Sequence, residues 1–458
     1  MSFFHDCWDS VRGNVRNCLT TPLTKKRLLI FGGIFVAFVL FIVILVVCLN
    51  GGSSSPAAQG SDALNNGPLT FGLVDNSWLK TTYINKINEN LAKIEEKLNL
   101  KSYIESKLGA MIWSVGASNC AQASQKDAVS QTLEGIDAAK RLASSLGNLI
   151  LASGTQDMTE AKANSKVAML ISLDGGYTID SRLGVLRMFR DLGVRVMTLT
   201  GNCSTPWASS SSLTTFGKAV VGEANRMGLL LDLAGSSSAV ITAALASSTA
   251  PVIFNGIGSQ SLTNVPTNLD NATLSSLKGK GHVVMVSFKC AVIKASNGSC
   301  SQIDVINHIN VIRDLAGAAS VGIAADFGGA DADYPTDLKN ISGVADLFNK
   351  LYEKNNWGLS DLEGLAYGNF INALQSSANA ANSTQTPNDN LEDEAELKIL
   401  PNNTLVCYSD VPIRYPTNTP TAATTPATTA VTTAAPTTQA TTPTTTQPTT
   451  TAPETKKP

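Results

Sequence analysis

The sequence predicts an α/β protein whose main domain is a (β/α)8 barrel of the TIM type, with an N-terminal transmembrane helix and a disordered C-terminal tail. Three observations support this fold class. Short apolar segments alternate with helix-like segments through the middle of the chain. The apolar segments are nearly continuous, which is typical of parallel strands covered on both faces. About eight such segments are present, the number that closes a barrel of this kind.

The expected strands are residues 70–75, 111–116, 167–174, 194–201, 229–235, 251–256, 282–288 and 321–326. The clearest helical patterns between them are residues 84–107, 126–146, 181–192 and 303–315. In barrels of this type the loops that follow the carboxyl ends of the strands carry the functional residues. We therefore expect any site to lie where these strands end.

The apolar run of residues 28–49 is long enough to cross the roughly 30 Å hydrocarbon core of a membrane. Lysines and arginines precede it, and the first positive charge after it is Lys80. The positive-inside rule then predicts a single-pass plasma-membrane protein with its C-terminal domain outside the cell. The expected segments are a cytoplasmic segment (1–27), the anchor (28–49), a flexible stalk (50–68), the barrel domain (69–408) and a Thr/Pro-rich, mucin-like tail (409–458).

The net charge is -2, and no basic cluster indicates a nucleic-acid partner. The expected outer part contains an odd number of cysteines, which predicts one interchain bridge or one free thiol. Cys120 and Cys203 follow expected strands at the same rim, and Cys290 and Cys300 flank a short loop. Cys407 is left over, and we expect it to link two copies in a homodimer.

Several asparagines stand in the N-x-Ser/Thr pattern of N-glycosylation sites. We expect glycans at Asn271, Asn297, Asn340, Asn382 and Asn402. Asn202 also fits the pattern, but its neighbour Cys203 makes its use unexpected.

Several ordered stretches resemble the membrane dipeptidases, a family of two-zinc peptidases. MTLTGNCSTPWA (197–208) resembles the family's MTLTHNCNTPWA, and GGYTIDSRLGVLRMF (175–189) resembles its GGHSIDSSLGVLR segment. PVIFNG (251–256) and VGIAADFGG (321–329) resemble PVIFSH and VGFGGDFDG. The resemblance covers about residues 69–408 and implies the barrel fold, a Cys120–Cys203 pair and an interchain cysteine near Cys407.

The resemblance also implies where a metal site would lie. The bridging glutamate of the family corresponds to Asp174, its two histidine ligands to Gly235 and Gly256, and a further aspartate to Asp326. A histidine and an arginine that contact substrate correspond to Gly201 and Thr263. The family's H-x-D motif after the first strand is replaced by LVDNSW, which contains no histidine.

Glycine offers no side-chain ligand, and the carboxylates of Asp174 and Asp326 alone do not make a zinc site. We therefore expect no catalytic residue, no cofactor and no intact metal site. The predicted function is that of a catalytically inactive surface glycoprotein that binds an unidentified extracellular ligand or protein through the former active-site rim. Two alternatives stay open: a zinc-dependent dipeptidase with residual or altered hydrolase activity, and a structural mucin-like surface or matrix component.

Overall fold

The computed structural model describes residues 59–74, 76–116, 128–201, 203, 205–209, 211–294, 299–325, 327, 333–381 and 387. The expected anchor (28–49), the tail (409–458) and most of the stalk lie outside these residues. Within the described part, no helix combines the length and the apolar character needed to cross a membrane.

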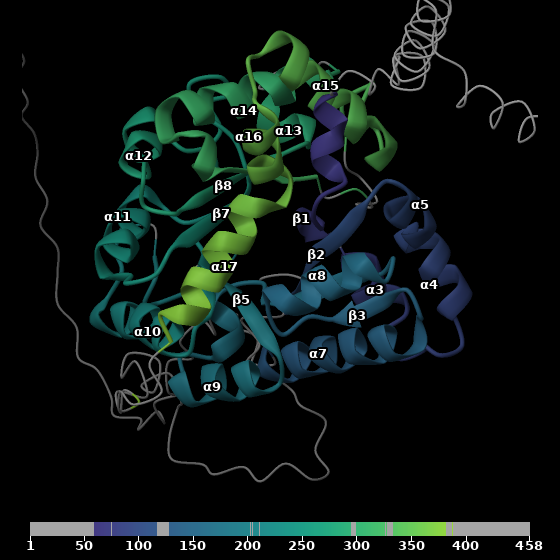
Figure 1. The fold of residues 1–458 in the computed structure, drawn as a ribbon. Coiled ribbons are helices and arrows are strands. Elements are labelled where there is room, and N and C mark those ends of the chain that lie inside the picture. Colours follow the sequence, from purple (N-terminus) through teal and green to yellow (C-terminus); the bar gives the residue numbers. More distant parts are fainter. Residues whose placement is uncertain are drawn as a thin grey trace, which may run out of the picture. The chain divides into compact units, whose positions relative to one another are not determined.

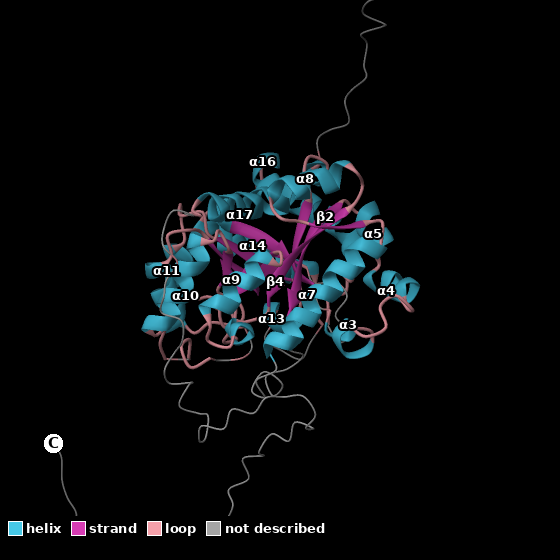
Figure 2. Cartoon of the chain, turned by 90° about the horizontal axis from the view of Figure 1, so that it is seen from below, coloured by secondary structure: helices cyan, strands magenta, loops and turns pink. Residues whose placement is uncertain are grey.

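Parallel strands form a single curved sheet at the centre of the domain (Figures 1 and 2). Its strands pair in the order β1 (Leu69–Val74), β2 (Leu108–Val115), β4 (Val167–Leu173), β5 (Val194–Thr198), β6 (Leu230–Asp232), β7 (Val252–Ile257), β8 (Val283–Ser287) and β9 (Val321–Ala324). A further short strand, β3 (Leu149–Leu151), pairs with β4. A Cβ atom built on Gly72 of β1 would lie only 2.6 Å from the Cβ of Ala324 in β9, so the first and last strands lie side by side. The sheet is therefore a (β/α)8 near-barrel.

Helices surround these strands (Figure 2). The helices before β5 are α3 (Ser77–Thr82), α4 (Leu91–Leu98), α5 (Leu100–Glu105), α7 (Ala128–Ser145), α8 (Thr155–Ala163) and α9 (Leu183–Asp191). Those after it are α10 (Thr215–Arg226), α11 (Ser238–Ser247), α12 (Asn271–Ser276), α13 (Cys290–Ile293), α14 (Gln302–Ala316), α15 (Val344–Lys354), α16 (Leu359–Glu363) and α17 (Asn369–Asn379). The helix expected over 84–107 is divided because Asn99 has a left-handed backbone (φ 53°), which ends α4 and begins α5.

Side chains alternate along each strand between the helices and the barrel interior. The interior-facing set is a separate apolar cluster that includes Val196, Leu230, Ile253 and Met285. Phe370 and neighbouring residues of α17 belong to the same cluster, and Figure 1 shows this helix lying across the strands. One end of the barrel is thus packed with apolar groups, and the residues two positions further along the same strands open into a cavity.

Candidate functional site

A cavity of about 250 Å³ lies where the parallel strands end. Its lining comes from nearly every strand end around the barrel. Among the described residues it consists of Asp174, Thr198, Gly201, Asp232, Ala234, Gly235, Asn255, Gly256, Ile257, Thr267, Ser287, Lys289, Val292 and Ala324. We call it the mouth cavity. Asp174, Gly201, Gly235 and Gly256, the positions that the family resemblance points to, all line it.

Asp232, the last residue of β6, is a buried carboxylate in the cavity wall. Its Oδ1 accepts hydrogen bonds from the backbone N–H of Ala234 (2.9 Å) and of Asn255 (3.0 Å). Its Oδ2 accepts one from the hydroxyl of Thr198 (3.2 Å). Burial raises the pKa of Asp232 to about 7, because the hydrogen bonds offset only part of the desolvation and the charge of Asp174 raises it further.

Asp174 follows β4 and lies beside an ammonium group. Lys80 Nζ is 3.9 Å from its Oδ2, and the Lys80 side chain is only 12% exposed. The hydroxyl of Tyr177 donates a long hydrogen bond of 3.4 Å to the same oxygen. The carboxylate at the position of the family's bridging glutamate therefore has an internal cation as its neighbour.

The three glycines at the mouth share a left-handed backbone, with φ of 61° at Gly201, 76° at Gly235 and 74° at Gly256. They differ in the space around them. A Cβ on Gly201 would clash with the carbonyl oxygen of Asp174, and one on Gly235 would lie 2.7 Å from the carbonyl oxygen of Gly201. A Cβ on Gly256 would meet nothing within 4 Å. Two of the three positions thus exclude any side chain in the present backbone.

Other predicted residues have different outcomes. Thr263 is buried, and its hydroxyl lies 3.4 Å from Nε2 of His308. Asp326, the counterpart of the family's other aspartate, lies outside the described residues.

The Cys290–Cys300 disulfide is confirmed. Cys203 is also disulfide-bonded, but Cys120 lies outside the described residues, so its partnership stays a prediction. Cys407, Asn297, Asn382 and Asn402 likewise lie outside them. Asn271 and Asn340 are exposed, as a glycan acceptor needs to be.

Sequence reasoning missed two charged residues of this region. Lys80 and Asp232 do not belong to any quoted motif, and only the fold brings Lys80 to Asp174. Asp232 carries a usable signal, because a charged residue at the end of an apolar strand faces the functional rim of a barrel.

Comparison with known proteins identifies the family. A family model described as membrane dipeptidase (peptidase family M19) matches residues 63–388. The chain belongs to the membrane dipeptidase family. Dipeptidase 3 of Rattus norvegicus is 34% identical over 280 residues, which are 58% of this chain and 56% of that protein. An uncharacterized dipeptidase of Schizosaccharomyces pombe is 34% identical over 250 residues, 52% of this chain and 60% of that protein. The chain therefore matches between about half and three fifths of these relatives' length.

Solved structures support the same fold. The probable dipeptidase PvdM of Pseudomonas aeruginosa aligns with a TM-score of 0.60 at 15% identity, covering 70% of this chain and 98% of that one. A metallo peptidase of Rhodobacter sphaeroides, bound to a phosphinate mimic of L-Ala-D-Ala, aligns with a TM-score of 0.56 at 17% identity, covering 68% and 99%. At these identities the likeness concerns the fold.

The described residues at the mouth of this membrane dipeptidase-family chain do not make up a two-zinc site. Zinc in proteins is bound by nitrogen, sulfur or carboxylate-oxygen atoms at about 2.0–2.3 Å from the ion. Two of the positions that correspond to the family's ligands are glycines here, which have no such side-chain atom. The two histidines of the described region accept hydrogen bonds from backbone N–H groups instead. His282 accepts a hydrogen bond from the Val252 N–H at the start of β7, and His308 accepts one from Ser259 N–H. Among the residues described, no three His, Cys, Asp or Glu side chains converge.

Asp232→Asn tests the charge of the buried carboxylate. The amide Oδ1 still accepts from both backbone N–H groups, while its Nδ2 faces Thr198. Because the folded-state pKa of Asp232 is raised to about 7, wild-type stability falls as pH rises from about 4 to above 7. We expect the free energy of unfolding of D232N to be about 2 to 4 kcal/mol higher than that of wild type at pH 8. At pH 4 we expect the two free energies of unfolding to be similar. Denaturant titration at both pH values measures this, with the exposed Asp314→Asn as control. Equal destabilisation by D232N at both values would contradict the assignment.

Gly235→Ala and Gly256→Ala form a matched pair, because the two positions have nearly the same φ. G256A meets only the left-handed backbone penalty of about 1–2 kcal/mol. G235A adds a collision with the Gly201 carbonyl, and overpacking of this kind costs about 1–3 kcal/mol more. Unfolding midpoints measure the difference, and equal values for the two variants would show that the loops move apart freely.

Proposed function

We propose that this chain is a catalytically inactive, cell-surface member of the membrane dipeptidase family that binds an extracellular ligand or protein through its mouth cavity. The observation that carries the proposal is the ammonium of Lys80 beside Asp174. It supplies one positive charge to a carboxylate at a position where the family resemblance implies a metal.

The charge of Lys80 opposes a second cation at Asp174. Like charges repel in proportion to the inverse of their separation, and the repulsion is stronger in a partly buried site than in water. The side chain of Asp174 is about one third exposed and that of Lys80 much less. A divalent ion entering here has to overcome the repulsion of the lysine charge.

Metal-dependent hydrolysis needs an ion that acidifies a water molecule and polarises the carbonyl that is attacked. Gly235 and Gly256 provide no ligand for such an ion. The packing around Gly235 leaves no room for one to be added. These features support a loss of peptidase chemistry with retention of the scaffold.

The cavity has the character of a binding site. It is concave and mixes apolar walls, such as Ile257 and Val292, with convergent polar groups, such as Asn255, Ser287 and Lys289. Small-molecule sites combine these properties. At about 250 Å³ it suits a small polar molecule or one side chain of a protein partner.

The surface location is part of the proposal. Residues 28–49 would anchor the chain with the barrel outside the cell, and the exposed Asn271 and Asn340 would accept glycans there. The family's name refers to membrane dipeptidases, in keeping with a membrane location.

Metal loading tests the loss of chemistry. The full chain in detergent, incubated with zinc and dialysed, is expected to retain far less than one zinc per chain and to leave dipeptides uncleaved. Lys80→Met is the informative variant, because it leaves Asp174 without its cation and should raise metal retention. About two zinc ions per wild-type chain with chelator-sensitive cleavage would replace the proposal with that of an active dipeptidase.

A binding screen tests the second part of the proposal. A folded protein that binds neither peptides nor cell-surface proteins in this screen would argue against the binding role.

Cys407 tests the predicted homodimer. We expect a band of twice the monomer mass on non-reducing gels that disappears on reduction, because a single leftover thiol outside the cell pairs between chains. Cys407→Ser should abolish it, whereas Cys290→Ser with Cys300→Ser should not. A band of monomer mass under both reducing and non-reducing conditions would contradict the predicted disulfide-linked homodimer.

A further inference from the structure

His308, on α14, is a buried imidazole (1% exposed) that bridges two walls of the mouth cavity. Its Nδ1 accepts a hydrogen bond from the backbone N–H of Ser259 at 2.9 Å. Its Nε2 lies 3.1 Å from the carbonyl oxygen of Ile293 in α13. One ring nitrogen must accept and the other must donate, so only the neutral Nε2–H tautomer satisfies both contacts.

Asn268 makes a parallel bridge from the loop that follows β7. Its Oδ1 accepts from the Gly258 N–H at 2.6 Å, and its Nδ2 donates to the carbonyl oxygens of Thr263 and Val292, each at 2.9 Å. The two bridges are in contact distance of the same backbone: a Cβ on Gly258 would lie 2.6 Å from His308 Nδ1 and 3.2 Å from Asn268 Oδ1. Glycine at 258 is therefore what lets both side chains reach the loop.

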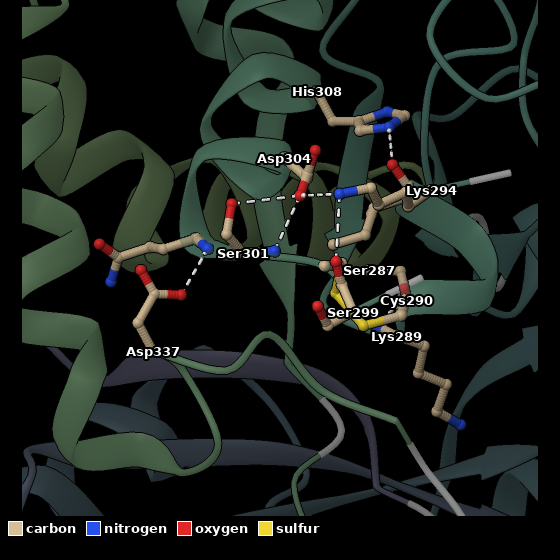
Figure 3. Close-up of a disulfide and its surroundings, with 12 residues drawn as sticks. Ser287, Lys289, Cys290, Lys294, Ser299, Ser301, Asp304, His308 and Asp337 are labelled. Atoms are coloured by element: carbon tan, nitrogen blue, oxygen red, sulfur yellow. Dashed lines mark hydrogen bonds and ion pairs between the residues drawn. A yellow bond between two sulfur atoms is a disulfide. The ribbon is translucent and has the colours of Figure 1, made fainter. Parts of the chain in front are cut away.

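The two segments that these side chains join follow the adjacent strands β7 and β8, and both contribute to the cavity lining. Ile257 and Thr267 line the cavity at the two ends of the β7 loop, while Lys289 and Val292 line it from the α13 side. The Cys290–Cys300 disulfide and the Lys294–Asp304 ion pair (3.6 Å) tie α13 to the start of α14 (Figure 3). His308 is thus held on one side by a cross-linked frame and reaches the β7 loop on the other.

We propose that His308 and Asn268 are positioning residues of the mouth cavity, which together fix the β7 loop against α13 and so set the width of the ligand site. This role rests on the proposed binding function. It extends that function because His308 is too buried to meet a ligand directly and acts through Ile257, Thr267 and Val292. Thr263, at the position of the family's substrate arginine, belongs to this bridge, since its carbonyl accepts from Asn268 and its hydroxyl lies near His308.

Two variants each keep one of the two hydrogen bonds of His308 and remove the other. In His308→Asn the amide oxygen can take the place of Nδ1 and accept from Ser259, with no group reaching Ile293. In His308→Gln the amide nitrogen can take the place of Nε2 and donate to Ile293, with no acceptor left for Ser259. We expect hydrogen exchange of the Ser259 amide to be about tenfold faster in H308Q, the equivalent of one lost hydrogen bond of about 1.4 kcal/mol, and little changed in H308N.

Methyl NMR of the full chain in detergent reports the cavity wall. We expect H308Q to shift or broaden the methyl signals of Ile257 and Val292 and to leave Val220, on α10, unchanged. A purely structural role for His308 would instead lower stability throughout the domain without a difference between the two variants. Equal Ser259 exchange in H308N and H308Q, or unchanged Ile257 and Val292 signals in H308Q, would overturn the proposal.

The wild-type protein supplies a test that needs no variant to fold. Nitrogen-15 spectra should show His308 as the neutral Nε2–H tautomer, with a scalar coupling between its Nδ1 and the Ser259 amide nitrogen across their hydrogen bond. An Nδ1–H tautomer, or an absent coupling, would exclude the bridge. None of these readouts uses a ligand, so failure of the positioning role is distinguishable from failure of the binding function.

Discussion

The close approach of neighbouring strand-end loops is the constraint on which the mouth of this barrel depends. The backbone after β4 abuts Gly201 after β5, and the carbonyl of Gly201 in turn abuts Gly235 after β6. The backbones of these loops pack directly against each other. Gly201 and Gly235 also have a positive φ, a conformation that glycine adopts without strain. The side chains of the cavity wall therefore come from other positions: from within the strands, as Thr198 and Asp232 do, or from other parts of the loops, as Thr267 and Lys289 do.

Contacts within the protein compensate part of the charge at the mouth. Asp232 receives its donors from β5 and from the backbone next to β6 and β7, so a single carboxylate ties the ends of three adjacent strands together. Buried carboxylates require such partners, because an uncompensated one is strongly destabilising. Asp174 obtains its compensation from Lys80. The arrangement gives a polar site whose two carboxyl groups are held by contacts within the protein.

The sequence was sufficient for the fold because parallel strands buried on both faces leave continuous apolar runs, such as β2 and β4, that are hard to mistake. The sequence did not predict β3, because a strand of three residues is too short to show a recognisable pattern. It also did not predict the break at Asn99, where the backbone conformation of one residue divides a continuous helical pattern. The glycines at the rim were found through the family resemblance. Lys80, Asp232 and the His308 bridge were not, because their roles arise from contacts between residues far apart in the chain, such as positions 80 and 174, which no local spacing encodes.

These contacts also bear on how easily the proposed loss of peptidase chemistry could be reversed. Space exists for a side chain at Gly256, but a histidine there gains no second ligand at Gly235, where the Gly201 carbonyl blocks the way. Moving the loops apart would disturb the backbone around Asp174 and, with it, the Lys80 ion pair. A stepwise return to a metal site passes through variants that have lost stability and gained no ligand set. In the proposed function the remaining groups of the mouth bind the ligand, and the proposed bridge behind the cavity wall fixes the shape in which they are presented.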